Sequence, residues 1–217
     1  MSRTREIGIF GFTMDDDFQL GGRPRLPPDI EWPFDPETQK PFAFLFGLRG
    51  EVLALAANGL DIPPECELSV FASVGPDGFD HRLAVGDRND GSLVPSVPST
   101  VLLHRRTSDS RDLPADFSFP IRPARVGLGP EVEEEVLGTG ELVRSASGMP
   151  KVGGVPSWLQ DPVPVEDSVF ILQLSSRIIE MLGPPQFSDV LGGGIGYLFL
   201  HRKPQLGRAG HFFVQFT

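Results

Sequence analysis

Histidine, the side chain most often used for proton transfer and metal binding, occurs four times in this chain of 217 residues. The positions are His81, His104, His201 and His211. No two of them are four residues apart, and the chain has no His-Glu-x-x-His segment of the zinc-enzyme type. A triad built from distant positions is recognised by geometry and not by order, and no histidine here is singled out. We therefore predict neither a catalytic residue nor a metal ligand.

Cys66 and the glycine-rich segment 192–196 are the next candidates for chemistry. Cys66 lies between Glu65 and Glu67, whose carboxylates disfavour a reactive thiolate. As the only cysteine it forms no internal disulfide, which is typical of a reducing compartment. The glycine-rich segment lacks the Lys-Ser/Thr ending of a phosphate-binding loop and leads into a strand-like run. We interpret it as a turn and predict no cofactor.

Carboxylates are the remaining candidates, and they indicate binding more than catalysis. Three consecutive ones are Asp15, Asp16 and Asp17, without the spacing of a calcium loop. A second group comprises Glu131, Glu134 and Glu135, which share one face if residues 131–137 form a helix between Pro130 and Gly138. These groups are either solvated surface or a docking surface for a basic protein.

The charge balance excludes several partners. The chain has 19 Lys and Arg against 29 Asp and Glu, a net charge of −10. Nucleic acids and anionic membranes both require a basic surface, so we predict that the protein binds neither directly. The longest apolar runs have the length of strands, and the N-terminus is too short and too acidic for a secretory signal. We expect a soluble, cytoplasmic protein with a protein partner, whose encounter opposite charge would accelerate.

An internal repeat supplies the elements that must position these residues. Leu20-Gly21-Gly22-Arg23-Pro24 is echoed by Val152-Gly153-Gly154-Val155-Pro156. Paired glycines permit positive φ, and the proline that follows fixes φ and removes a hydrogen-bond donor. The predicted turn residues are therefore Gly21, Gly22, Pro24, Gly153, Gly154 and Pro156.

Similar elements follow each turn at a nearly constant offset. A strand (42–48 or 169–174) leads to a short helix (50–58 or 176–182), then to a second strand (68–73 or 196–200) and a third (81–85 or 211–215). The alternative is coincidence among common turn and strand signals. We predict an α+β fold, mostly antiparallel sheet with few short helices. Two similar β-α-β-β halves, 19–90 and 150–217, form one domain (1–217) with an intervening segment, 91–149, in which 101–105 and 117–121 read as strands.

These motifs resemble the YwqG-like family of bacterial proteins, a domain of unknown function. The matching stretches are residues 20–33, 41–45, 151–160, 172–174 and 194–200. The resemblance implies an antiparallel α+β fold in two similar halves and no established activity. It also implies similarity to immunity proteins that neutralise secreted toxin nucleases. The chain departs from the family at 46–49, where a Gln-Ile-Asn-type ending is usual, and at Ser175 and Ser176, where an acidic residue is usual.

Three functions are therefore considered. The preferred one is an immunity-type protein that holds a basic toxin domain, such as a nuclease, in an inactive complex, with the carboxylates Asp15, Asp16, Asp17, Glu131, Glu134 and Glu135 at the interface. The second is an enzyme of unknown class with a pocket between the two halves, walled by the Gly-Gly turns, Trp32, Trp158 and His211. The third is a housekeeping protein-interaction module without a toxin.

Overall fold

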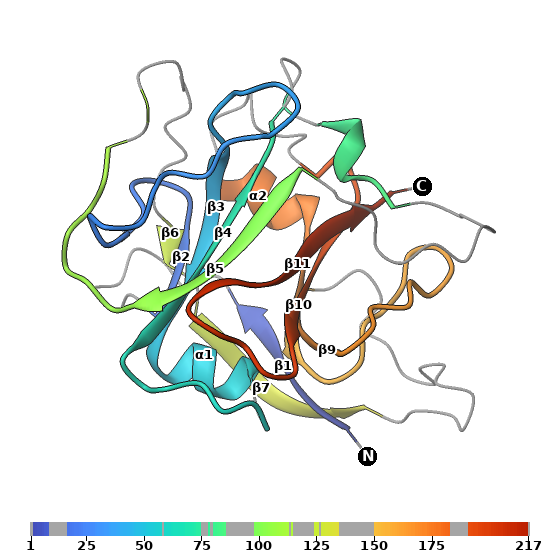
Figure 1. The fold of residues 1–217 in the computed structure, drawn as a ribbon. Helices are drawn as coiled ribbons and strands as arrows, with labels where there is room; N and C mark the ends of the chain where they lie inside the picture. The colour runs from blue at the N-terminus through green and yellow to red at the C-terminus, as the bar shows by residue number, and fades with distance from the viewer. Residues whose placement is uncertain are drawn as a thin grey trace.

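The computed structural model describes residues 2–8, 17–57, 59–74, 78, 80–85, 98–112, 114, 124–125, 127–134, 150–182 and 191–216. Over these residues the strands form one antiparallel sheet in the order β6-β2-β3-β4-β5-β11-β10-β9-β8-β1-β7, accompanied by two short helices (Figure 1). This architecture confirms the predicted sheet-dominated α+β class. The predicted strand 117–121 lies outside the described residues, as do Asp15, Asp16 and Glu135.

The elements have the following bounds: β1 Ser2–Gly8, β2 Phe18–Leu20, β3 Ala43–Leu48, α1 Gly50–Ala56, β4 Cys66–Ala72, the 3₁₀ helix η1 His81–Leu83, β5 Ser99–Arg105, β6 Ala124–Arg125, β7 Gly127–Glu134, β8 Lys151–Gly153, β9 Ser168–Ser175, α2 Ser176–Leu182, β10 Ile195–His201 and β11 Gly207–Gln215.

The N-terminus of helix α1 is hydrogen-bonded to Asp17. The Asp17 carboxylate accepts a hydrogen bond from the backbone N–H of Glu51 (3.0 Å), and the Asp17 carbonyl accepts one from the N–H of Arg49 (2.9 Å). Gly50 is required between them, because its φ is +54° and a Cβ there would lie 2.5 Å from an Asp17 carboxylate oxygen. Helix α1 then turns Val52, Leu53 and Ala56 toward the core.

The core consists of one central cluster and two outer clusters. The central cluster combines both helices with β3, β4, β5, β9, β10 and β11, so the N-terminal and C-terminal strands share it. Because side chains alternate along a strand, the other face of the sheet carries separate clusters. The first outer cluster is Leu26, Trp32, Phe42, Phe44, Phe71 and Leu102. The second outer cluster is Val85, Phe170, Ile195, Tyr197, Phe199 and Phe213.

Both Gly-Gly turns follow a three-residue strand. Gly21 and Gly22 (φ 59° and 74°) follow β2, and Gly153 and Gly154 (φ 72° and 78°) end and follow β8. Strand β2 pairs with β3, and β8 pairs with β9, in each case antiparallel. These positive φ values explain why glycine occupies all four positions.

The predicted helix at 131–137 is wrong where the structure describes it, because residues 127–134 form strand β7. Strand β7 pairs with β1 along almost its whole length, with Arg5 opposite Glu131. The backbone bonds to β1 replace those of a helix, and β7 is the last strand in the sheet order. An edge strand also tolerates Pro130, which has no N–H to donate. Glu131 is exposed on this strand.

The predicted third strand at 81–85 is also wrong. Residues 81–83 form η1, which begins at Asp80, whose carboxylate accepts a hydrogen bond from the N–H of Arg82 (3.0 Å). The strand between β4 and β11 is instead β5, which pairs antiparallel with both, with a register shift in β11 between Arg208 and Gly210. His81 and His211 therefore do not begin matching strands, because His211 lies inside β11 opposite Phe199.

Among the residues that the structure describes, no helix is both long and apolar enough to cross a bilayer.

Candidate functional site

A serine and a histidine meet on the outer face of strands β4 and β5. The Ser69 hydroxyl lies 2.9 Å from Nε2 of His104, and Nδ1 of His104 lies 3.0 Å from the Arg105 carbonyl oxygen. Because a carbonyl only accepts, Nδ1 carries the proton and Nε2 accepts from Ser69. His104 is 1% exposed, and burial lowers its pKa. The imidazole is therefore neutral at pH 7 and aligned as a base toward the hydroxyl.

Glu67 lies beside this pair, directly opposite His104 in the sheet register. One Glu67 oxygen is 3.3 Å from Nη1 of Arg49 and 3.4 Å from Nε of Arg106. Glu67 and Arg49 are 5% and 6% exposed, so their ion pair is buried. Burial raises the pKa of Glu67, against the opposing effect of the nearby positive groups. The result is a carboxylate held by two guanidinium groups from separate elements.

A small pocket is lined by three of these groups, Arg49, Glu67 and Ser69. Its volume is about 20 Å³, and its lining residues are Gln19, Arg25, Phe44, Gly47, Leu48, Arg49, Glu67, Leu68 and Ser69. Gln19 ties the pocket to the first Gly-Gly turn, since its Nε2 donates to the carbonyls of Gly21 (2.8 Å) and Arg23 (2.9 Å). This volume is close to the roughly 15 Å³ that one water molecule needs. The groups present could polarise a water or a small anion.

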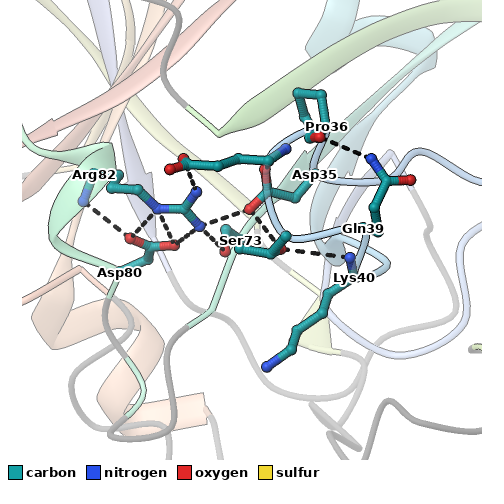
Figure 2. Close-up of polar contacts among 9 residues, drawn as sticks. Asp35, Pro36, Gln39, Lys40, Ser73, Asp80 and Arg82 are labelled. Carbon is teal, nitrogen blue, oxygen red and sulfur yellow. Dashed lines mark hydrogen bonds and ion pairs between the residues drawn. The ribbon is translucent and has the colours of Figure 1, made fainter.

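A second charged group, the Arg82 cluster, joins Arg82 to Asp35, Glu37, Ser73 and Asp80 (Figure 2). The Arg82 guanidinium lies 2.6 Å from a carboxylate oxygen of each of Asp35, Glu37 and Asp80. Ser73 accepts a further, longer bond of 3.3 Å. These hydrogen bonds raise the pKa of Arg82, and the bonds to Asp80 and Asp35 make the largest contributions. Arg82 therefore connects η1 and the end of β4 to the loop 34–41.

Asp35 is the buried centre of that loop. Its carboxylate also accepts from the N–H of Glu37 (2.9 Å) and from the Thr38 hydroxyl (2.8 Å). Burial would raise the pKa of Asp35, but the hydrogen bonds from Arg82, Glu37 and Thr38 outweigh it and lower the pKa. The Asp35 backbone completes the loop, with its N–H bonded to the Lys40 carbonyl (2.8 Å) and its carbonyl to the Gln39 N–H (2.8 Å).

Over the second outer cluster, two neutral polar side chains of the C-terminal strands make the connections to a loop. The Tyr197 hydroxyl donates to the Ser157 carbonyl (2.7 Å) and accepts from the N–H of Leu159 (3.0 Å). Gln215 accepts from the N–H groups of Leu159 (3.1 Å) and Gln160 (3.2 Å) and donates to a carbonyl, that of Asp161 (2.9 Å). These bonds fasten residues 157–161 over the second outer cluster and have no evident reactive role.

The residues predicted for a site are dispersed in the structure. Asp17 caps α1, and Glu131 lies on the edge strand β7. Trp32 packs against Phe71 at a ring separation of 5.4 Å, and Trp158 stacks on Phe199 at 5.9 Å, so the two tryptophans belong to different outer clusters. Cys66 is buried, which together with Glu65 raises the pKa of its thiol, in agreement with an unreactive cysteine.

Sequence reasoning missed the Ser69, His104 and Glu67 group as well as the Arg82 cluster. A usable signal was present in the first case, because Glu67 and His104 interrupt otherwise apolar strands. A charged residue in such a strand requires a partner. Arg82 gave no comparable signal, because Asp80 is its neighbour in the chain but Asp35 and Glu37 come from a loop more than forty residues away.

In the described part of the chain, no three His, Cys, Asp or Glu side chains gather in a way that could hold a metal ion. No protein-family model matches the chain, and no curated protein matches it.

Proposed function

We propose that this protein is an immunity-type binding protein that acts in the cytoplasm. It holds a cognate secreted toxin, a basic domain such as a nuclease, in an inactive complex. The carrying observation is the net charge of −10 in a chain whose exposed carboxylates are spread over several elements. Examples are Glu51 on α1, Glu131 on β7 and Glu180 on α2. Such a surface attracts a basic protein and repels nucleic acid and anionic membranes.

The proposed interface uses fewer carboxylates than the sequence analysis predicted. Asp17 is already engaged at the N-terminus of α1, so its contribution is to hold that helix. Glu131 is exposed on the edge strand and stays a proposed contact, together with Asp15, Asp16, Glu134 and Glu135. Inhibition follows from occlusion of the toxin's active site and needs no chemistry by this chain.

The proposal includes the two-halved architecture and membership of the YwqG-like family. Support comes from the positions of the Gly-Gly turns after β2 and β8. Further support comes from the chain order strand, helix, strand in 43–72 and again in 168–201. In the second half the predicted third strand is β11. In the first half, 19–90, no third strand forms at 81–85, and β11 pairs instead with β5, which belongs to the intervening segment 91–149.

The test is co-expression with the product of the adjacent open reading frame. We expect that product to stop growth when expressed alone, and we expect this protein to restore growth and to co-purify with it. The association rate should fall as NaCl is raised, because salt screens the attraction. If the two proteins form no complex and growth is not restored, the proposal is wrong. A complex with a harmless neighbour would instead indicate the housekeeping interaction module.

A second candidate function, an enzyme of unknown class, is favoured by one observation. Ser69 donates to a neutral His104 at the wall of a pocket that also contains Arg25 and Arg49, which is the arrangement of an activated hydroxyl. All lining residues of this pocket come from the N-terminal half, so it is not a pocket between the halves. Turnover of a panel of small esters and amides by the wild type, lost in Ser69→Ala and in His104→Gln, would support this candidate. No turnover by the wild-type protein would count against it.

A further inference from the structure

Phe34 is a large apolar side chain left in solvent next to a well-packed cluster. It is 51% exposed, whereas Trp32, two residues earlier, is buried in the first outer cluster. Phe34 begins the loop 34–41 and is bridged to Pro41 at the loop's other end. A half-exposed aromatic ring at the neck of a loop is a suitable anchor for a protein interface, where aromatic residues dominate the binding energy.

The loop that carries Phe34 is fixed before any partner arrives. Its backbone is closed by the bonds of Asp35 to Lys40 and Gln39, and by the bond from the Phe42 N–H to the Pro33 carbonyl (2.9 Å). Arg82 holds the Asp35 carboxylate from outside the loop, as Figure 2 shows. Thus the conformational entropy of the loop is already lost in the free protein. Preorganisation of this kind lowers the cost of binding.

The charge around Phe34 selects the kind of partner. Residues 29–41 together with Asp80 and the two arginines that contact this segment, Arg82 and Arg111, contain five carboxylates and three cations. Leu206 is equally prominent, at 57% exposed, but its exposed charged neighbours in the chain are Arg202, Lys203 and Arg208. An acidic surround favours a basic partner at Phe34, and the basic surround of Leu206 disfavours the same partner there.

We propose that the loop 34–41 is the principal docking element for the toxin, an inference that rests on the proposed function. Phe34 enters an apolar pocket of the toxin, and the carboxylates of Glu31 and Glu37 face Lys and Arg side chains around that pocket. The Arg82 cluster keeps the ring presented in one orientation.

The main experiment measures the dissociation constant of the complex with the purified adjacent-gene product. We expect Phe34→Ala to weaken binding about 30-fold, the effect of a hot-spot residue of about 2 kcal/mol. Leu206→Ala is the matched control, since it removes an equally exposed apolar side chain from a basic surround, and it should change affinity less than about 3-fold. Thermal unfolding of both variants should resemble that of the wild type, because both side chains are largely in solvent.

A second measurement does not depend on truncating the ring. Replacement of Phe34 by the photo-reactive residue benzoylphenylalanine keeps an aromatic group in place, and irradiation should cross-link it to the toxin. The same replacement at Leu206 should give no cross-link. In addition, Arg82→Gln should speed amide hydrogen exchange in 35–40 and weaken binding about tenfold through the loss of loop order.

The possible failures are distinguishable. If the wild-type chain neither binds nor protects against the adjacent product, the proposed function fails and this inference fails with it. If the wild type binds, but Phe34→Ala binds equally well and no cross-link forms at position 34, only the docking inference is overturned. Loss of binding in Leu206→Ala alone would also overturn it, because it would indicate that the partner uses the basic surround.

Discussion

The two outer clusters cover the same face of one sheet, yet they are fastened by different chemistry. Over the first, charged groups make the connections: Glu67 with Arg49 and Arg106, and Asp35 with Arg82. Over the second, the amide of Gln215 and the phenol of Tyr197 bind the backbone of 157–161. Trp158 adds near-parallel stacking on Phe199 and Phe213 at ring separations of 5.9 Å and 6.3 Å.

The difference concerns the electrostatics of the two regions. Hydrogen bonds between neutral side chains and the backbone hold a segment without adding a charge or a group that titrates. Buried charged side chains add both an electrostatic field and a titrating group, and burying each charge costs free energy unless it stays paired. The N-terminal region carries the pocket, the titrating pair of Glu67 and His104, and the clamped loop. The C-terminal region also contains a buried Lys151 and a His211 whose pKa is lowered by burial, but the bonds that hold 157–161 are made by the neutral Tyr197 and Gln215. The following predictions test this contrast, from the largest expected effect to the smallest.

Removing the guanidinium of Arg49 should have the largest effect. Arg49→Met leaves the buried Glu67 carboxylate with a weaker set of partners, so we expect the free energy of unfolding at pH 7 to fall by about 3 kcal/mol. In the double variant Arg49→Met/Glu67→Gln the loss should be smaller than the sum of the two single losses, because no buried charge remains. Urea unfolding measures all three. Strict additivity would show that the two side chains do not interact.

Removing one of the neutral hydrogen-bonding side chains that hold 157–161 should lower the free energy of unfolding by a smaller amount, and by the same amount at every pH. Gln215→Leu removes the acceptor of the Leu159 and Gln160 N–H groups, which should cost about 2 kcal/mol of unfolding free energy. Because no titrating group is changed, the loss should be the same at pH 5.5 and pH 7.5. A loss that differed clearly between the two pH values would break the proposed contrast between the regions.

The Arg82 cluster is partly in solvent and should contribute less. Arg82→Lys keeps the charge but cannot reach Asp35, Glu37 and Asp80 together. We expect a loss of about 1 kcal/mol, reduced by solvent screening. Hydrogen–deuterium exchange should locate the change in 35–40, whereas residues 157–161 should exchange at the wild-type rate and serve as an internal control. Unchanged exchange in 35–40 would refute the clamping role.

The smallest expected effect is a change in the pH dependence of stability. Burial lowers the pKa of His104 in the folded protein. Below the ordinary value of 6.5 the unfolded imidazole therefore takes up a proton that the native one does not, and the free energy of unfolding decreases as the pH is lowered. The pKa of Glu67 is raised above the ordinary value of 4.5, so its native carboxyl takes up a proton first and stability rises as pH falls. The two effects oppose each other in the wild type.

Glu67→Gln removes one of these opposing effects. The variant should lose more unfolding free energy between pH 7 and pH 5 than the wild type does, measured by urea titration at each pH. Asp35 and Asp80 do not affect this comparison. Their pKa values are lowered in the folded protein, so the stability they contribute is lost only at pH values below the ordinary pKa of 3.8. An equal or shallower slope in the variant would contradict the assigned directions.

The amino-acid sequence by itself determined the local elements and the fold class. Strands β3, β4, β9 and β10 and helix α2 were predicted within a few residues, because continuous apolar runs and adjacent glycines are signals that act over a few neighbours. The two local errors have different causes. Residues 131–134 pair with β1, so a distant segment overrode a weak helical preference. Residues 81–83 form a 3₁₀ helix that is capped by the neighbouring Asp80, and this short-range cap was not recognised in the sequence.

Only the tertiary structure decided which residues meet. Local sequence patterns are compatible with several strand orders. The structure pairs β5 with β11 and places β1 between β7 and β8. Register set Glu67 opposite His104, and chain folding brought Arg82 to Asp35 across 47 positions. Hydrophobic periodicity is a property of neighbours along the chain. The pairing of buried charges depends on where distant segments come together, and the periodicity carries no information about that.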